Sequence, residues 1–322
     1  MTSRLPESVV RQGLSLRLAE TDFSGLGEKL EGKVRDSYLQ GDRRLIMTTD
    51  RVSAFDVVLG TVPFKGQILD ALSRYWFEQT KHIADNHILE TPDPVVTAVE
   101  ECQVFGVEMI VRAYLTGSSS TSIWTHYESG ARQYCGHTLP EGMRKHQPLA
   151  QPLITPTTKA EKGDHDAPLS AAEVVERGLA TADEFAEMSE ICLKLFSFGT
   201  AVAADRGLIL VDTKYELGRR KDGTIVLVDE VHTPDSSRYW YTDGYRKAME
   251  DGTEPRALDK EYLRRYLVDQ GYRGQGTAPV LPDDVLIEAC QRYAEIYALL
   301  TGEPFAPDLE PPAARIRTNL GI

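Results

Sequence analysis

The segment "VDTKYELG", residues 211–218, carries charged side chains at three alternate positions. Side chains alternate between the two faces of an extended chain, so Asp212, Lys214 and Glu216 would project from one face of a strand. A solvated face of an antiparallel sheet would explain these charges, and so would a site for a charged ligand. The residues opposite this strand decide between the two interpretations.

A β-hairpin is predicted to bring a further carboxylate to this strand. The segment "GRRKDGT" separates it from "TIVLVDEV", and Asp-Gly is a strong signal for a two-residue turn. With Asp222 and Gly223 in that turn, Glu216 would lie directly opposite Asp229. Two opposed carboxylates need a cation, and Mg²⁺ is commonly held by one or two carboxylates plus substrate phosphates. We therefore predict that Glu216 and Asp229 bind Mg²⁺ beside Lys214; a longer or bulged loop would instead leave both acids in water.

A glycine turn near the start of the chain is a candidate phosphate site. The segment "GEKLEGKV", residues 27–34, matches the Walker pattern except at Val34, where a hydroxyl would be required. The following "KVRDSYL" is typical of a strand and not of the helix that cradles phosphates in a P-loop. We exclude a P-loop, but Gly32 with Lys33 and Arg35 still allows close approach to a ligand; solvated surface charge is the alternative.

A second candidate anion site lies in "VRAYLTGSSS", residues 111–120. Arg112 ends a predicted strand, and Ser118 and Ser119 lead into a predicted helix, where hydroxyl and N–H groups favour an anion. Arg238 in "TPDSSRYW" could reach the same anion, or could sit in an ordinary surface turn.

Two loops hold further polar candidates. They are a loop that follows a strand, "TTDRVSAFD", and a linker-like connection, "TPTTKAEKGDHDAP". The candidates are Asp50, Arg51, Ser53 and Asp56 in the first, and Lys159, Lys162, His165 and Asp166 in the second. A solvated linker would equally explain the second group.

The elements that must position these residues are predicted from periodicity and capping signals. Strands are expected at 33–39, 43–49, 105–115, 208–217 and 224–231, and helices at 68–84, 120–130, 256–270 and 283–301. Capping boxes at Ser170 and Thr181 predict two more helices, the second of which is long, amphipathic and ended by Gly207. We expect a β-rich lobe over residues 1–114, a larger α/β lobe over 115–302 and a loosely attached Pro-rich tail over 303–322.

Composition restricts the class of protein. Hydrophobic residues make up 41% and charged residues 26% of the 322 residues, which is typical of a globular chain. The formal net charge of -13 argues against nucleic acid as a partner. Neither a membrane-spanning run nor a signal peptide is evident, and the four cysteines form no CxxC pair, so we expect a cytoplasmic protein with free thiols and no membrane partner.

Six segments together resemble the phosphoribosylaminoimidazole-succinocarboxamide synthase, or SAICAR synthetase, family. They are "GKVRDSY", "TTDRVSAFD", "EMIVRAYLTGS", "ITPTTKAEKGDHD", "LILVDTKYELG" and "LVDEVHTPDSSRYW", in the family's order, and the length resembles the family's longer form. The resemblance implies an ATP-dependent ligase of purine biosynthesis that joins L-aspartate to the carboxylate of a carboxyaminoimidazole ribotide (CAIR), giving SAICAR, ADP and phosphate. It also implies an acyl-phosphate intermediate, Mg²⁺, and an α+β fold with two lobes and ATP in the cleft between them.

The resemblance also implies roles for individual residues. ATP would be bound by the turn of Gly32, Lys33, Val34 and Arg35, by the strand backbone around Glu108, Ile110 and Val111, and by Lys214 with the Mg²⁺ ligands Glu216 and Asp229. CAIR would be bound by Arg112, Ser118, Ser119 and Arg238 at its phosphate, and by Asp212, Ser53 and Asp56 elsewhere. L-aspartate would bind near Lys159, His165 and Asp166, and the catalytic residues would be Lys214 and Asp212.

Two other functions stay open at this point. A small-molecule kinase would use a similar ATP cleft but would release ADP with its acceptor alone. A nucleotide-sensing module would bind ATP and release no ADP. We expect a monomer.

Overall fold

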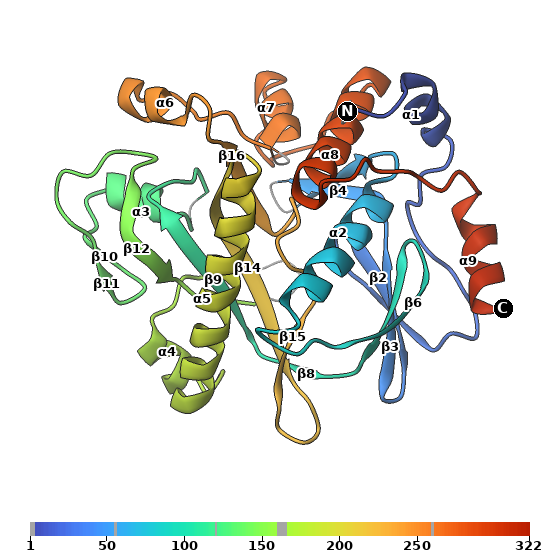
Figure 1. Cartoon of the computed structure of the whole chain (residues 1–322), viewed down its shortest axis with the longest axis horizontal. Coiled ribbons are helices and arrows are strands. Elements are labelled where there is room, and N and C mark those ends of the chain that lie inside the picture. The colour runs from blue at the N-terminus through green and yellow to red at the C-terminus, as the bar shows by residue number, and fades with distance from the viewer. Residues whose placement is uncertain (1–3, 55–56, 120, 160–165, 259–260) are drawn as a thin grey trace.

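The computed structural model describes residues 4–54, 57–119, 121–159, 166–258 and 261–322. The chain is a mixed α+β structure with two main antiparallel sheets and helices packed around them (Figure 1).

The smaller main sheet has five strands in the order β1-β2-β3-β7-β6. Its strands are β1 (Glu28–Glu31), β2 (Arg35–Gln40), β3 (Arg43–Thr48), β6 (Ile88–Asp93) and β7 (Val96–Glu100). Helix α2 (Lys65–Thr80) contacts β3 and helix α8 (Asp283–Thr301). The predicted strand after Gly32 is therefore confirmed as β2, which supports the exclusion of a P-loop.

The larger sheet has seven strands around β14 (Leu208–Arg219). The others are β8 (Gln103–Val104), β9 (Val107–Tyr114), β12 (Pro148–Ile154), β13 (Thr157–Thr158), β15 (Ile225–Val228) and β16 (Ser237–Tyr241). The sequence analysis assigned β9 to the first lobe, but β9 pairs directly with β14. The change of sheet therefore falls between β7 and β8, ahead of residue 115.

The remaining elements surround these sheets. They are the pairs β4 (Arg51–Ala54) with β5 (Val57–Thr61) and β10 (Gln133–Tyr134) with β11 (His137–Thr138), and the helices α1 (Glu7–Gly13), α3 (Ile123–Glu128), α4 (Ala171–Glu176), α5 (Ala182–Asp205), α6 (Tyr245–Asp251), α7 (Glu261–Asp269) and α9 (Pro312–Leu320). No helix among the described residues is long and apolar enough to cross a membrane.

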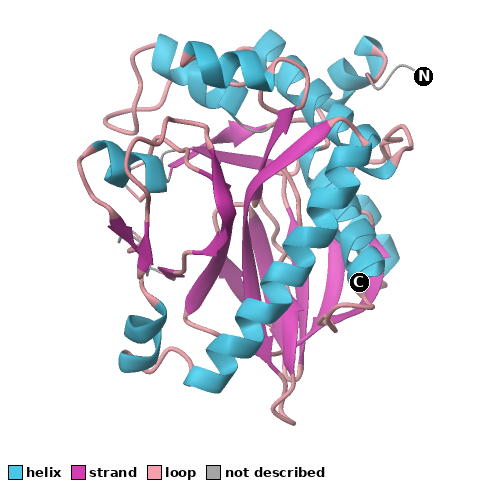
Figure 2. Ribbon diagram, turned by 60° about the vertical axis from the view of Figure 1, so that its left-hand side comes forward, coloured by secondary structure: helices cyan, strands magenta, loops and turns pink. Residues whose placement is uncertain are grey.

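Helix α5 covers one face of the larger sheet and fixes the orientation of β14. Both predicted capping boxes are present, with Thr181 and Glu184 closing the start of α5. Its buried face includes Met188 and Leu195, which join Tyr215 and Leu217 of β14 in the main core. Figure 2 shows the long helix crossing one face of the sheet. Because this face of β14 is apolar, the alternate side chains must project away from the core.

The β14–β15 hairpin differs from the predicted register by one residue. Its loop has three residues, because Arg220 N–H donates to Thr224 O and Gly223 N–H donates to Arg220 O, with Gly223 at φ 93°. A three-residue loop with a left-handed glycine is a common hairpin connection. Glu216 therefore pairs with Val228, and the prediction that it lies directly opposite Asp229 is wrong.

The C-terminal segment is anchored, which corrects the prediction of a loosely attached tail. In α9, Arg315 donates from Nε and Nη2 to the two carboxylate oxygens of Asp93 at 2.9 and 3.1 Å, and both side chains are buried. Ile316 is also fully buried, and Asn319 donates to Asp93. The helix thus packs on β6 through one buried carboxylate.

Candidate active site

A large open cleft collects most of the predicted site residues. Its volume is about 2240 Å³, part of which is open to solvent. The predicted residues that line it are Gly32, Lys33, Val34, Arg35, Ser53, Glu108, Ser118, Ser119, Lys159, Asp166, Lys214, Glu216 and Asp229. Asp56, Lys162 and His165 lie outside the described residues.

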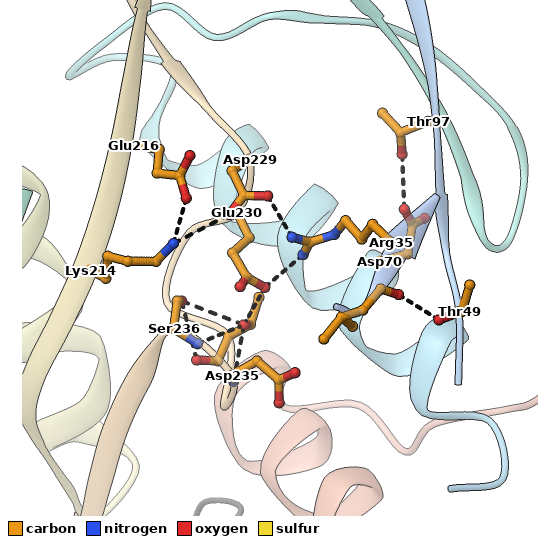
Figure 3. A network of polar contacts seen from close by, with 12 residues as sticks. Arg35, Thr49, Asp70, Thr97, Lys214, Glu216, Asp229, Glu230, Asp235 and Ser236 are labelled. Carbon is orange, nitrogen blue, oxygen red and sulfur yellow. Dashed lines mark hydrogen bonds and ion pairs between the residues drawn. The ribbon is translucent and has the colours of Figure 1, made fainter. Parts of the chain in front are cut away.

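Lys214 is the centre of the acidic end of the cleft. Its Nζ lies 2.5 Å from Glu216 Oε1, 3.1 Å from Glu108 Oε1 and 3.8 Å from Asp229 Oδ2 (Figure 3). The second carboxylate oxygen of Glu216 accepts from Lys159 Nζ at 2.5 Å. Alternation along β14 places Lys214 and Glu216 here, since Tyr215 points into the core. Asp229, which directly follows β15 and has a left-handed backbone conformation (φ 65°), reaches the same ammonium group.

The charges in this group shift one another's proton affinities. Burial raises the pKa of Glu216, but Lys214 and Lys159 outweigh burial and bring that pKa to about 2. Burial lowers the pKa of Lys214, but the carboxylates of Glu216, Asp229 and Glu108 together raise it well above its ordinary value. Burial raises the pKa of Asp229 despite Arg35, and the charge of Glu216 adds to that rise. Lys214 is therefore a fixed cation, and Asp229 is a carboxylate that would gain from a further positive charge.

Arg35 connects the two sheets across the cleft. Its Nη1 donates to Asp229 Oδ1 at 2.5 Å and its Nη2 donates to Glu230 Oε2 at 2.7 Å (Figure 3). Thr233 donates to the same oxygen of Glu230. The sequence analysis did not select Glu230, although its position directly after Asp229 was a usable signal.

The carbonyl oxygens of the turn before β2 accept hydrogen bonds from side chains of the protein. Arg51 donates to the carbonyl oxygens of Gly32 and Lys33 at 2.9 and 3.1 Å, and to Asp36 Oδ1 at 2.6 Å. The hydroxyl of Thr49 donates to the carbonyl oxygen of Val34 at 2.5 Å. Because these carbonyl oxygens already accept hydrogen bonds within the protein, the turn is held in one conformation at the cleft wall. Arg51 was among the polar residues singled out in its loop, but its acceptors, which lie 15–19 positions earlier in the chain, were not predicted.

Two predicted phosphate-binding arginines lie on the strands that flank β14, one on each side of Asp212. Asp212 pairs with Arg112 of β9 on one side and with Arg238 of β16 on the other. Its Oδ2 lies 3.7 Å from Arg112 Nη1 and 3.4 Å from Arg238 Nη1. Thr155 Oγ1 accepts from Arg112 Nε at 3.0 Å. Asp212 is buried between the two guanidinium groups and, like both arginines, is not among the described residues that line the cleft; its catalytic role stays a prediction.

Of the β9 residues predicted to bind ATP, Glu108 lines the cleft, and its contact with a nucleotide stays a prediction. Of the described β9 residues, neither Ile110 nor Val111 lines it. Ile110 O accepts from Thr155 N–H, and Val111 pairs with strands on both sides. Neighbouring strands therefore use the backbone that was expected to meet the adenine.

The opposite wall of the cleft contains residues that the sequence analysis missed. They are Asp235, Arg264, Arg273, Gly274 and Gln275, from the loop before β16, from α7 and from the loop after it. The Gly-rich stretch "GYRGQG" with its arginine was a signal for the last three.

The donor set fits a metal ion only in part. Within the described residues, no group of three or more His, Cys, Asp or Glu side chains is arranged to hold a metal. Glu216 and Asp229 share Lys214 instead. Since Mg²⁺ is usually held by one or two carboxylates plus phosphates and water, these two acids fit an ion that arrives with a nucleotide.

Comparisons with known proteins agree with this geometry. A family model described as SAICAR synthetase matches residues 28–279. The phosphoribosylaminoimidazole-succinocarboxamide synthase of Legionella pneumophila (strain Paris) is 48% identical over 296 residues, which cover 91% of this chain and 94% of that protein. The chloroplastic enzyme of that name from Arabidopsis thaliana is 45% identical over 318 residues, covering 96% and 77%.

Solved structures show the same fold. The SAICAR synthase of Saccharomyces cerevisiae in complex with SAICAR is 30% identical with a TM-score of 0.79, and the match covers 90% of this chain and 100% of that one. A SAICAR synthetase in complex with ADP is 26% identical with a TM-score of 0.65, covering 87% and 100%. On this evidence the chain belongs to the SAICAR synthetase family of ligases and carries out SAICAR synthesis in purine biosynthesis.

Proposed function

We propose that the cleft joins L-aspartate to the carboxylate of CAIR with ATP, through an acyl phosphate. The observation that supports this most is the fixed cation Lys214, held among Glu108, Glu216 and Asp229 in the same cleft as the glycine turn. Phosphoryl transfer depends mainly on positioning and on neutralising charge, and this arrangement can do both. In this proposal the smaller sheet supplies the nucleotide turn and the larger sheet supplies the substrate residues.

The nucleotide would lie at the acidic end of the cleft. The turn of Gly32 and Lys33 would approach its phosphates, since Arg51 holds the carbonyls of that turn away from the ligand. Glu216 and Asp229 would hold Mg²⁺, which neutralises phosphate charge when it is bound. Lys214 would then contact the transferred phosphoryl group or the reacting carboxylate.

CAIR would lie toward Ser118 at the other side of the cleft. Arg112 and Arg238 would receive its phosphate with Ser118 and Ser119, and Asp212 would hold the two arginines on either side of it. Ser53, and Asp56 three residues later in the chain, would contact the ribose or the base. Two arginines and a hydroxyl pair are the donors expected for a phosphate.

L-aspartate would bind near Lys159 and Asp166, with His165 in the same segment. Lys159 already contacts a carboxylate, that of Glu216, and could exchange it for a substrate carboxylate. Asp166 would face the substrate amine. We assign no general base.

The reaction balances in two steps. A carboxylate oxygen of CAIR attacks the γ-phosphorus of ATP, the bond to the bridging oxygen breaks, and ADP leaves. The amine of L-aspartate then attacks the acyl carbon, loses a proton, and inorganic phosphate leaves as the amide forms. Each step passes negative charge to an oxygen, and in this proposal Lys214 would lie where that charge develops.

ADP release by the purified chain tests this proposal. With ATP, Mg²⁺ and CAIR, steady ADP release should require L-aspartate. Sustained release without L-aspartate would indicate a kinase instead, and ATP binding without any ADP in any mixture would indicate a sensing module. We also propose that the protein is a monomer and acts in the cytoplasm. Light scattering of the purified chain would test the monomeric state.

A further inference from the structure

The loop between β15 and β16 carries three acidic side chains of the cleft wall, those of Asp229, Glu230 and Asp235. It leaves β15 through two residues with left-handed backbone conformations, Asp229 at φ 65° and His232 at φ 52°. Neither is glycine, and a non-glycine residue in this conformation is strained unless the surrounding structure fixes it. The path of this loop therefore needs an anchor, and the fully buried side chain of His232 supplies one.

His232 is fixed by contacts with four other elements of the fold. Its Nε2 lies 2.5 Å from the hydroxyl of Tyr215 in β14, and its backbone oxygen accepts from the Tyr239 hydroxyl in β16 at 2.9 Å. Its ring makes a T-shaped contact with Trp76 of α2, with 4.7 Å between the ring centroids. Gly199 of α5 leaves room for the ring, since a methyl group there would overlap the imidazole. These contacts hold the imidazole in one place.

The contact between Tyr215 and His232 joins the two halves of the charged group around Lys214. Tyr215 stands between Lys214 and Glu216 in β14 and points into the core, while its two neighbours point into the cleft. His232 follows Asp229 by three residues on the other half. One contact in the core therefore sets how far the loop of Asp229 lies from the strand of Lys214 and Glu216 (Figure 3).

Stability alone explains this polar contact less well than a positioning role does. The other ring nitrogen of His232, Nδ1, is buried and makes no hydrogen bond among the described residues. Burying such a nitrogen destabilises a fold, and an apolar pair of the same shape would avoid that cost. A hydrogen bond is directional, so it fixes the distance and angle between two elements more narrowly than an apolar contact does.

We propose that Tyr215 and His232 are positioning residues of the Mg²⁺ site. Their hydrogen bond holds Asp229 at the distance from Glu216 at which both acids can bind one ion together with the nucleotide. Neither side chain is among the described residues that line the cleft, and both are fully buried, so they act through their neighbours. This inference rests on the proposed function, which places Mg²⁺ at Glu216 and Asp229.

Magnesium-dependent ADP binding by the full chain tests the assignment. Tyr215→Phe removes one hydroxyl, and it should raise the Mg²⁺ concentration at half-saturation about 3- to 10-fold, as expected for one lost hydrogen bond, in calorimetry of ADP binding over a Mg²⁺ series. His232→Leu should give the same rise, and His232→Gln a smaller one, because an amide can still bond to the Tyr215 hydroxyl. CAIR binding without nucleotide should stay within about 2-fold of the wild-type value, since sites that share no contacts vary independently.

A double-mutant cycle and a matched control separate positioning from a loss of stability. Tyr215→Phe combined with His232→Leu should raise the half-saturating Mg²⁺ concentration no more than either change alone, because both remove the same bond. Tyr127→Phe is the control, since it removes a tyrosine hydroxyl of α3 that donates to the carbonyl oxygen of Pro140 at 2.8 Å. Urea unfolding should show lower stability for both tyrosine variants, but only Tyr215→Phe should change the half-saturating Mg²⁺ concentration.

Gly199→Ala repeats the test without removing either partner. Its added methyl group would displace the imidazole, so it should raise the half-saturating Mg²⁺ concentration as Tyr215→Phe does. The assignment fails if that concentration stays within about 2-fold of wild type in both variants, or if Tyr127→Phe raises it equally. A wild-type chain that binds Mg²⁺ and ADP but forms no SAICAR would contradict the proposed function and leave this assignment standing.

Discussion

At the scale of single residues, Glu216 and Asp229 provide the sharpest test of the metal proposal. Each carboxylate lies within ion-pair distance of Lys214, at 2.5 and 3.8 Å. Glu216→Gln and Asp229→Asn should each weaken Mg²⁺-dependent ADP binding by at least about 10-fold, because each removes a charged oxygen ligand. Magnesium titration of ADP binding measures this, with Asp42→Asn as the control, since Asp42 is an exposed acid that pairs with the exposed Lys221. Equal magnesium affinity in all four proteins would remove these acids from the metal site.

Arg51 carries a second residue-scale prediction. Its guanidinium holds the carbonyls of Gly32 and Lys33 together with Asp36, and a lysine offers no planar fork for these acceptors. Arg51→Lys should therefore raise KM for ATP by about 10-fold, the cost of one or two charge-assisted hydrogen bonds, while KM for CAIR stays the same. Steady-state kinetics with each substrate varied in turn gives the answer. A rise in both KM values would point to general loosening of the fold.

At the same scale, the sequence predicted which charges belong to the site better than it predicted how they meet. Alternation along residues 211–218 placed Lys214 and Glu216 together correctly, because the period of a strand is fixed by its geometry. Asp229 reaches the ammonium group of Lys214 because its own backbone, just after β15, has a left-handed conformation. No local sequence pattern indicated that conformation. Asp212 shares their alternation but lies between two arginines that come from other strands.

At the scale of elements, the β14–β15 loop offers a test of register. Lys221, Asp222 and Gly223 form the loop, and Arg220 already bonds to Thr224 across it. Deleting Lys221 would leave a two-residue Asp-Gly loop between the same pair, which is also a favoured connection. We expect the deletion to keep SAICAR synthesis within about 3-fold of wild type, since the exposed Lys221–Asp42 ion pair contributes little.

Deleting Thr224 is the matched contrast. That change removes a paired residue, so β15 must slip by one position and turn its side chains to the other face. SAICAR synthesis should then be lost. Activity assays of both deletion variants measure this, with circular dichroism to confirm that each variant folds. Equal activity in the two variants would contradict the observed register.

Element-scale prediction from the sequence succeeded where the signal was local and failed where it was not. Helix α5 was predicted from its capping box and its apolar periodicity, both of which are short-range features. Helix α9 was read as part of a loose tail because the segment is rich in proline. Its anchor is the pair of Arg315 and Asp93, more than 200 positions apart in the chain, and only the fold reveals it.

At the scale of the whole molecule, two buried histidines should make stability depend on pH. Burial lowers the pKa of His87 to about 3, with Arg35 and Arg44 lowering it further, and burial lowers the pKa of His232 to about 3. The folded chain then binds fewer protons than the unfolded chain, in which histidine has a pKa of about 6.5. The contribution of these two neutral histidines to the free energy of unfolding is complete above pH 6.5. It is lost progressively as the pH falls toward 3.

Two buried carboxylic acids give stability a pH dependence of the opposite sign over part of the pH range. Burial raises the pKa of Asp50 and of Asp70 to about 6. The folded chain therefore holds these protons more tightly, so their contribution is complete below pH 4 and is lost as the pH rises through 6. The pH dependence of the wild type alone is thus a sum of opposite slopes, and the histidine part must be isolated by substitution.

Replacing His232 isolates that part. Its Nε2 lies 2.5 Å from the hydroxyl of Tyr215 in the core, and its ring packs on Trp76. His232→Gln keeps a polar group there but cannot titrate, so it should be less stable than wild type at pH 7. The difference in free energy of unfolding should shrink by up to about 1.4 kcal/mol per pH unit below pH 6.5. Urea unfolding of both proteins from pH 7 to pH 5 measures it, and a difference that stays constant across this range would show that His232 is not held neutral by burial.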